Sequence, residues 1–468
     1  MSYRIVRDPL GEVRVPQEAY YGAQTQRARE NFPISGLRLP RAFIRAQGII
    51  KASAAYANGQ VGMLEPRKAQ AIIQAAEEVI DGRWDDHFVV DVFQAGAGTS
   101  QNMNANEVIA RRASELLDGR VDEPLPIHPN DHVNMAQSTN DTIHVAINIA
   151  AAEQLVHRLL PALRRLHEAL AEKAAAFDAI VKAGRTHLQD AVPIRLGQEF
   201  GGYAATLKGN LRRLEEAMED LYPIGLGGNA VGTGINAHPD YPRLAVQQVA
   251  ERTGLPFRLP EDRFAFMQNT HGAIRTSGAL KQLAVDLIKI TSDIRLLSSG
   301  PRTGLAEIRL PAVQPGSSIM PGKVNPVMAE MLHMVCCQVI GADAAITAAG
   351  MGSQLEINVL MPIIAYNLLH AIDILANGMR VFAERCVQGI EADEKQCRYW
   401  LERSAALATV LNPVLGYERT AQLVRQALAE NRPVRELVLE SGELTPDEVR
   451  RLFDYERMTE GLERDGRL

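Results

Sequence analysis

The chain has 468 residues, of which 46% are apolar and 23% charged, proportions that exclude a disordered or fibrous protein. Its 50 Lys and Arg residues against 56 Asp and Glu give a formal net charge of -6. This balance argues against nucleic acid as the partner, because phosphate binding needs clustered basic residues.

The composition also predicts the cellular compartment. No uninterrupted apolar run approaches the ~18 residues of a membrane span, so we expect no membrane partner. The N-terminal stretch MSYRIVRDPLGEVRV mixes charged and apolar residues, and we expect no secretory signal there. The four cysteines form no CxxC spacing and are too few for a disulfide framework: Cys336, Cys337, Cys386 and Cys397. We therefore expect a reducing, cytoplasmic location.

The N-terminal third of the chain is mixed in character. Its first ~40 residues hold too many prolines and glycines for long helices. Helical patterns begin near Arg41 and recur to about Leu117. The segment 121–140 is rich in Pro, Asn and Asp, so we interpret it as a loop that closes a first domain at 1–140.

Five long apolar-periodic stretches follow, at 144–181, 194–221, 264–297, 326–349 and 356–390. At 1.5 Å per residue they predict helices of ~35–55 Å, which form a bundle domain at 141–390. Five leucines of the first stretch recur at helical spacing on one face: Leu155, Leu159, Leu163, Leu166 and Leu170. Such helices have more apolar faces than one subunit can bury, so we expect oligomers. A smaller helical domain at 391–468 ends the chain.

Polar segments that contain glycine join these helices, at 94–106, 128–141, 184–198, 225–234 and 316–326. Helix caps and turns would explain any one of them alone. The segment 225–234 is rich in glycine but matches no phosphate-binding pattern. His128 and His132 have the spacing of helical metal ligands, but Pro129 argues against a metal site there.

The segment 316–326, GSSIMPGKVNP, carries the sharpest chemical signal. Gly316 and Gly322 allow backbone N–H groups to converge on an anion. Ser317 lies six residues before Lys323, whose charge favours ionisation of a nearby hydroxyl. Ser317 could act as a nucleophile beside a histidine and a carboxylate, or as a base that depends on strong electrostatic help.

This segment resembles the signature of the fumarase/aspartase superfamily, and the resemblance covers essentially the whole chain. Further segments resemble the family in the same order: GTSQNMNANE (98–107), QSTND (137–141), GRTHLQDAVP (184–193), AVGTG (230–234) and SGPRTGLAEI (299–308). The resemblance implies a mainly α, three-domain subunit whose five long helices form the core of a homotetramer. It also implies active sites shared between three subunits, a small dicarboxylate substrate, and neither cofactor nor metal.

The resemblance implies a role for individual residues as well. Removal of a proton beside a carboxylate creates a dianionic intermediate, which needs hydrogen-bond donors and a fixed positive charge. The implied catalytic residues are Ser317 as base, Lys323 as carboxylate ligand that also favours ionised serine, and His187 with Glu330 to activate water. The implied substrate-binding residues are Thr99, Ser138, Thr139, Asn140, Thr186, Ser318 and Asn325.

Smaller differences bear on the leaving group. GAGT (96–99), QSTND and QLEIN (354–358) resemble aspartases more than fumarases, so we expect L-aspartate to give fumarate and ammonia. The alternative is class II fumarase activity, which adds water to fumarate to give L-malate. His144, Val145 and Met361 depart from both patterns and leave the substrate open. A third hypothesis is a non-catalytic structural protein of this fold, as in lens crystallins; the retained catalytic residues argue against it.

Overall fold

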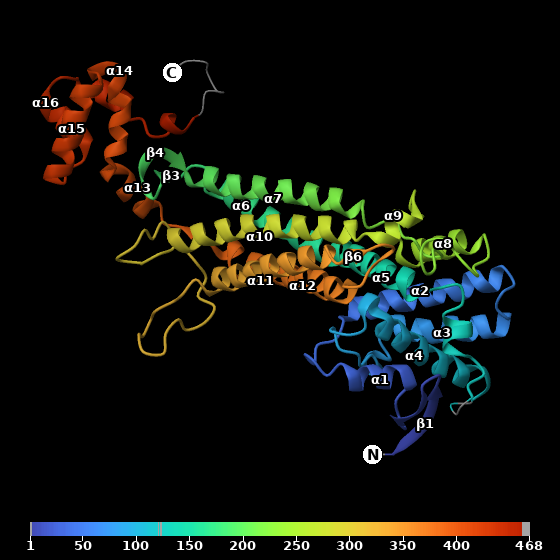
Figure 1. The fold of residues 1–468 in the computed structure, drawn as a ribbon. Coiled ribbons are helices and arrows are strands. Elements are labelled where there is room, and N and C mark those ends of the chain that lie inside the picture. The colour runs from blue at the N-terminus through green and yellow to red at the C-terminus, as the bar shows by residue number, and fades with distance from the viewer. Residues whose placement is uncertain (1, 120, 122–123, 461–468) are drawn as a thin grey trace. The chain divides into compact units, whose positions relative to one another are not determined.

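The computed structural model describes residues 2–119, 121 and 124–460, which form two compact units (Figure 1). Unit 1 comprises 1–161, 210–285 and 335–377, and unit 2 comprises 162–209, 286–334 and 378–468. Five long helices contribute residues to both units: α6 (Leu160–Ala176), α7 (Leu196–Met218), α10 (His271–Leu297), α11 (Val327–Gly350) and α12 (Met361–Arg385). The mainly helical fold is thus confirmed, whereas the division into three domains stays a prediction.

Unit 1 begins with a β-hairpin and is otherwise mostly helical (Figure 1). The hairpin pairs β1 (Tyr3–Asp8) with β2 (Gly11–Pro16) in antiparallel register, with Tyr3 opposite Pro16. The other elements wholly in unit 1 are α1 (Ala23–Asn31), α2 (Arg41–Gln60), α3 (Pro66–Ile80), α4 (Thr99–Asp118), α5 (Thr139–Gln154), α8 (Tyr241–Thr253), α9 (Arg263–Gln268), β6 (Ser353–Gln354) and β7 (Ile357–Asn358).

The core of unit 1 is built around α2. Its many alanines allow neighbouring helices to approach closely, and it packs against α3, α5 and α8. Its larger side chains Phe43, Ile49 and Ile50 are almost completely buried. Each buried side chain of this size contributes about 1.5–3 kcal/mol relative to exposure, which fixes α2 as the centre of the packing.

The first predicted long helix begins earlier than the apolar pattern indicated. Ser138 and Asp141 form a capping box, in which the Ser138 hydroxyl accepts from the Asn140 N–H (3.2 Å) and the Asp141 carboxylate accepts from the Ser138 N–H (2.9 Å). A π-helical turn (Leu155–Leu159) separates α5 from α6. The five leucines of the predicted stripe are all fully buried, which confirms their common face.

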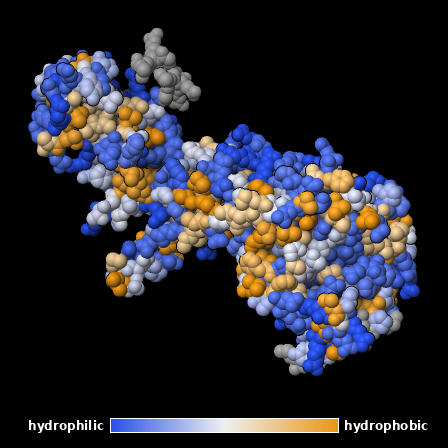
Figure 2. All heavy atoms as spheres, in the orientation of Figure 1, coloured by the Kyte–Doolittle hydropathy of each residue, from blue (hydrophilic) through white to orange (hydrophobic). Residues whose placement is uncertain are grey.

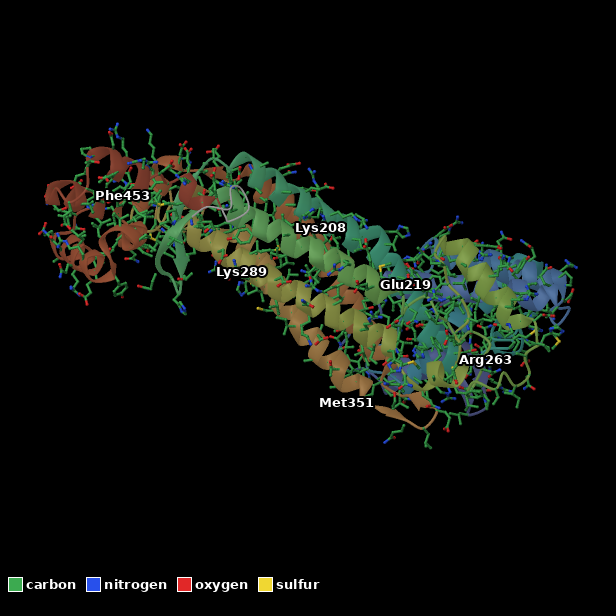
Figure 3. The ribbon with its side chains drawn as sticks, turned by 90° about the horizontal axis from the view of Figure 1, so that it is seen from above. Lys208, Glu219, Arg263, Lys289, Met351 and Phe453 are labelled. Atoms are coloured by element: carbon green, nitrogen blue, oxygen red, sulfur yellow. The ribbon has the colours of Figure 1, made fainter. Side chains whose placement is uncertain are left out.

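Unit 2 ends in a group of short helices with its own core. Its elements are β3 (Val181–Thr186), β4 (Gln189–Arg195), β5 (Ile308–Arg309), β8 (Glu391–Ala392), α13 (Glu394–Arg403), α14 (Asn412–Leu415), α15 (Tyr417–Glu430), α16 (Val434–Ser441) and α17 (Pro446–Leu452). Leu401, Leu423, Val438 and Phe453 lie in one buried cluster, to which Val181 of β3 also belongs. Phe453 is labelled in Figure 3.

Three predicted boundaries differ from the structure. The polar segment 184–198, expected as a loop, is mostly the β3–β4 hairpin, because its backbone pairs across a two-residue turn. The segment 94–106 becomes α4 from Thr99 onward. The last long helix begins at Met361, because residues before it form the small β6–β7 hairpin.

One long helix exposes much of its apolar surface. Within the described ranges, α11 is the helix long and apolar enough to cross a membrane by length and composition, and 33% of its most apolar window is buried. Met334 on this helix is 67% exposed, and Val285 on α10 is 52% exposed. Figure 2 likewise shows hydrophobic residues at the surface over the long helices. Exposed apolar surface of this kind is typical of a protein–protein contact.

Candidate active site

Ser317 lies in the loop that precedes α11, in unit 2. Its hydroxyl oxygen accepts hydrogen bonds from the backbone N–H groups of Ile319 (3.2 Å) and Met320 (2.9 Å). N–H groups that point at a hydroxyl oxygen favour its ionised form. The local backbone therefore provides part of the stabilisation that a serine base requires.

The same loop is closed by contacts across its base. The Gly316 N–H donates to the Lys323 carbonyl (2.8 Å), and the Asn325 amide donates to the Gly316 carbonyl (2.6 Å). A Cβ atom on Gly316 would lie 2.4 Å from the Lys323 carbonyl oxygen, so no other residue fits there. Gly322 has open space around it, but its φ of +82° favours glycine.

These contacts decide which predicted residues are free to bind a ligand. The Lys323 side chain is exposed and, within the described part of the chain, forms no ion pair, so it can meet a substrate carboxylate. The Asn325 amide group already donates within the loop, which gives Asn325 a structural function. Ser318 is exposed next to Ser317. Direct contact of Ser318 and Asn325 with substrate stays a prediction.

His187 and Thr186 lie at the tip of the β3–β4 hairpin in unit 2. His187 and Leu188 form its two-residue turn and have φ values of 56° and 59°. Two positive φ angles define a type I′ turn, which glycine and asparagine prefer and which strains a leucine. Both His187 and Thr186 are exposed, so the strained turn presents the predicted catalytic histidine to the outside of the unit.

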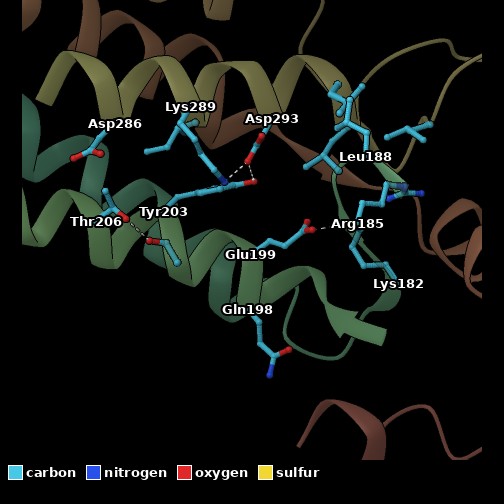
Figure 4. A pocket seen from close by; sticks show the side chains of 15 residues that line it. Lys182, Arg185, Leu188, Gln198, Glu199, Tyr203, Thr206, Asp286, Lys289 and Asp293 are labelled. Carbon is cyan, nitrogen blue, oxygen red and sulfur yellow. Dashed lines mark hydrogen bonds and ion pairs between the residues drawn. The ribbon is translucent and has the colours of Figure 1, made fainter. Parts of the chain in front are cut away.

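A buried charge network contacts strand β3 of this hairpin, and three of its members, Lys182, Arg185 and Glu199, are labelled in Figure 4. The Lys182 ammonium lies 2.8 Å from the Glu199 carboxylate and 3.1 Å from the Glu307 carboxylate. Arg185 donates two hydrogen bonds to Glu307, at 3.0 and 3.1 Å. Burial raises the pKa of Glu199. Because Lys182 and Arg185 belong to β3, the network fixes the strand that ends at His187.

A cavity of about 650 Å³ adjoins the network in unit 2. Tyr203, Lys289 and Asp293 lie on its wall, and the Tyr203 hydroxyl donates to Asp293 (2.9 Å) (Figure 4). Neither Ser317 nor His187 lines this cavity. This cavity therefore does not coincide with the predicted catalytic groups.

Glu330, the predicted partner of His187, lies in the first turn of α11 and is partly buried. Among the described residues no hydrogen bond joins it to His187. The pairing that the family resemblance implies is thus not formed within this single chain, and it stays a prediction.

The other predicted binding residues lie in unit 1, at the N-termini of two helices that contact each other. Thr99 is the first residue of α4, and Thr139 is the first residue of α5, preceded by Ser138. Free N–H groups and the helix dipole make such N-termini suitable for anionic groups. The Asn140 amide donates to the Ala230 carbonyl (2.8 Å), which connects α5 to the glycine-rich segment 225–234.

Asp141 holds the same segment from the interior, a function that the motif alone did not reveal. Its carboxylate is fully buried and accepts from the N–H groups of Gly227 (2.9 Å) and Asn229 (3.0 Å). Burial raises the pKa of Asp141 to about 6. The glycine-rich segment is therefore part of the support of α5.

The three residues that depart from the family patterns are all buried in unit 1. His144 stacks on Phe266 with ring centroids 4.2 Å apart, and burial lowers the pKa of His144 to about 4. Val145 and Met361 are completely buried. His144 and Val145 lie in α5 and Met361 begins α12, so all three belong to the core and none of the three side chains is open to solvent.

The predicted residues divide between the two units: Thr99, Ser138, Thr139 and Asn140 lie in unit 1, and the other seven lie in unit 2. The sequence analysis did not predict the buried charged residues that hold these elements in place. They are Lys51 in unit 1, and Lys182, Glu199 and Glu307 in unit 2. A lysine within an apolar stretch (GIIKASAAYA) was the available signal for Lys51. Within the described residues no group of three or more His, Cys, Asp and Glu side chains gathers as a metal site would.

Comparison with known proteins places these features in a family context. A protein-family model described as lyase matches residues 11–341, and a second, fumarase C C-terminus, matches 407–460. Fumarate hydratase class II 2 of Bradyrhizobium diazoefficiens is 49% identical, covering 97% of this chain and 96% of that protein. Aspartate ammonia-lyase of Bacillus subtilis is 46% identical, covering 98% and 96%. The crystal structure of class II fumarase from Schistosoma mansoni matches with a TM-score of 0.95, 36% identity and coverage of 98% and 99%.

Proposed function

This chain belongs to the fumarase/aspartase superfamily of lyases, and from that premise we propose that it interconverts fumarate and L-malate, as a class II fumarate hydratase does. The observation that carries the proposal is the similarity to four class II fumarate hydratases, at 48–50% identity over 96–98% of this chain. The aspartase reaction, predicted from three short motifs, becomes the second candidate.

The second candidate keeps specific support. GAGT, QSTND and QLEIN resemble aspartases, and two aspartate ammonia-lyases are 45–46% identical to this chain. Both reactions share the same first requirement, a base that removes a proton from the carbon beside a carboxylate. They differ in the group on the neighbouring carbon, which is hydroxyl in malate and ammonium in aspartate.

In the proposed dehydration, the Ser317 alkoxide removes the proton beside one carboxylate of L-malate, and the electron pair delocalises into that carboxylate. Lys323 binds the resulting dianion electrostatically, which lowers the barrier more than it stabilises the substrate. The hydroxyl then leaves as water, with a proton delivered from the side of His187 and Glu330. The remaining electron pair forms the double bond of fumarate, and Ser317 returns its proton to solvent.

Ultraviolet absorbance of fumarate distinguishes the candidates. The purified protein is supplied with L-malate and with L-aspartate in separate assays, without added metal or nucleotide. Fumarate from malate alone supports the proposal, whereas fumarate and ammonia from aspartate alone support the second candidate. The Ser317→Ala variant, purified identically, corrects for lyases of the expression host. A folded protein inactive on both substrates would contradict both candidates and favour the non-catalytic hypothesis.

We also propose that the active protein is a homotetramer whose sites combine residues of three subunits. Support comes from the exposed apolar surface of α11 and from the absence of a His187–Glu330 hydrogen bond among the described residues of one chain. Two inactive variants, His187→Ala and Ser317→Ala, should regain activity when they are dissociated and reassembled together, because some mixed sites carry neither change. A fully active monomer, or no recovery in a mixed tetramer, would contradict shared sites.

A further inference from the structure

Lys51 is a buried cation that the proposed reaction does not use. It lies on α2 and is 1% exposed. Its ammonium donates to three amide oxygens, at Asn102 (2.9 Å), Asn134 (3.0 Å) and Gln137 (3.0 Å). A lysine has three N–H donors, so these three bonds use all of them. Within the described residues no carboxylate lies within ion-pair distance, so the hydrogen-bond partners of this charge are neutral amides.

The charge of Lys51 decides how the Asn102 side chain is oriented. A primary amide can face a neighbour with its oxygen or with its NH₂ group. Because an ammonium group only donates hydrogen bonds, it can bond only to the amide oxygen. With its oxygen at Lys51, where the Thr142 hydroxyl also approaches it (3.2 Å), Asn102 turns its NH₂ group toward the Thr139 hydroxyl oxygen (3.3 Å) and the Asn134 side-chain oxygen (3.2 Å). Thr139 accepts this bond, so its single hydroxyl proton is free to be donated to another group.

The same cation orders the segment that leads into α5. With their oxygens at Lys51, Asn134 donates to the Gln137 carbonyl (3.2 Å), and Gln137 donates to the carbonyls of Val133 (3.0 Å) and Met135 (3.2 Å). These bonds hold the turn immediately before Ser138. The orientation of three amides therefore depends on one buried ammonium.

We propose that Lys51 is a positioning residue that acts through Asn102, and that it keeps the Thr139 hydroxyl oriented as a hydrogen-bond donor to a carboxylate of the substrate. The inference rests on the proposed function, in which Thr139 binds a dicarboxylate. Lys51 itself does not touch the substrate in this scheme. A neutral side chain at position 51 would let Asn102 rotate, and its oxygen would then take the Thr139 proton.

The protonation of Lys51 gives the scheme a pH dependence. Burial lowers the pKa of Lys51 to about 7, while Asp141 on α5 acts in the opposite direction. The groups facing Lys51 from α4 and from the 134–137 turn are neutral amides. Loss of the proton leaves a lone pair toward one amide oxygen, which favours rotation of that amide. We therefore expect the KM of the wild-type enzyme to rise above about pH 7.

A double-mutant cycle between Lys51→Met and Thr139→Val tests the scheme. Methionine keeps the length and removes charge and donors, and valine removes only the hydroxyl. Each single variant should raise KM about tenfold, the order expected for one hydrogen bond to a charged group, with little change in kcat. The double variant should be no worse than the single ones, because both remove the same donor. Multiplied effects, or an unchanged KM for Lys51→Met, would overturn the inference.

Asn102→Asp keeps the inference testable even where Lys51→Met fails to fold. The new carboxylate still accepts from Lys51 and pairs with its charge, so the fold should be retained, although the bond to the Asn134 oxygen (3.2 Å) is lost. It cannot donate to Thr139, and KM should rise as in Thr139→Val. An unchanged KM would contradict the role of Lys51. The pH profile adds a further measurement, since KM of Lys51→Met should lack the rise above pH 7, and parallel profiles would contradict the scheme.

Failure of the proposed function has a different signature. If Thr139→Val leaves KM unchanged in an active enzyme, Thr139 does not bind the substrate, and the proposed site is wrong. If Thr139→Val raises KM but Lys51→Met and Asn102→Asp do not, the site stands and the positioning role of Lys51 falls.

Discussion

The Lys182 ammonium and the Glu307 carboxylate lie 3.1 Å apart, and their side chains are 1% and 0% exposed. Removing one member of such a buried pair leaves an uncompensated charge and typically costs about 3–5 kcal/mol. Lys182→Met should therefore lower the melting temperature markedly, and it should also lower activity because β3 carries His187.

The matched control for this prediction is an exposed ion pair in the same unit. Arg380 pairs with Glu384, and both side chains are about half exposed (54% and 44%). Arg380→Gln should change stability by less than about 1 kcal/mol. Equal melting temperatures for Lys182→Met and Arg380→Gln would show that the buried network does not stabilise the hairpin.

Loss of the Ser317 hydroxyl should lower kcat about a hundredfold or more, with a modest change in KM, because the base is removed while the carboxylate ligands remain. Ser318→Ala removes a predicted carboxylate donor and not the base, so it should raise KM more than it lowers kcat. Lys323→Ala should change both parameters, because Lys323 holds a carboxylate as well as favouring the alkoxide. Steady-state kinetics on folded variants check these expectations; near-normal kcat of Ser317→Ala would remove Ser317 from the mechanism.

His144 should make stability depend on pH. Burial lowers the pKa of His144 to about 4, against 6.5 for an ordinary histidine. Between these values the unfolded chain binds more protons than the folded one, so the free energy of unfolding falls as the pH drops from 6.5 to 4. At about 1.4 kcal/mol per pKa unit, the loss is on the order of a few kcal/mol.

The His144→Phe variant keeps a ring against Phe266 and cannot titrate. Its melting temperature, measured relative to the wild type, should improve from pH 8 to pH 4.5. A constant difference across that range would show that His144 protonation does not contribute.

The type I′ turn predicts a stabilising substitution. Leu188 has a φ of 59° and is 71% exposed, so it adopts a strained backbone and buries little surface. Asparagine tolerates this conformation better, and Leu188→Asn should raise stability by about 1 kcal/mol. Leu10→Asn is the control, since Leu10 is 81% exposed and has no positive φ. A thermal melt in which Leu188→Asn is the less stable variant would contradict the strain argument.

The sequence predicted the long helices and the polar segments well, because helical periodicity and family motifs are local patterns. The buried leucine face at 155–170 is an example. The β3–β4 hairpin was missed because Gly184 and Pro193 inside its strands are residues typical of loops. Lys182 in β3 resembles a surface residue until Glu199 and Glu307 are placed beside it.

The buried residues that hold the candidate site in place could not be predicted from the sequence, because their partners are distant in the chain. Lys51 meets Asn102 and Gln137, which are 51 and 86 residues away in the chain. Asp141 meets Gly227, again 86 residues away. Such pairs depend on tertiary packing, whereas Ser317 and its N–H donors are neighbours in the chain and follow from the motif.

Two glycines of one loop should respond differently when every amino acid is tried at each position. Gly316 is crowded by the Lys323 carbonyl, so even alanine should abolish function, and no replacement should be tolerated. Gly322 is limited only by its backbone angle, so asparagine and aspartate should retain the most activity there and β-branched residues the least. In a saturation library scored for growth on the substrate, we therefore expect only glycine at position 316. At position 322, six residues away, a few other amino acids should also support growth.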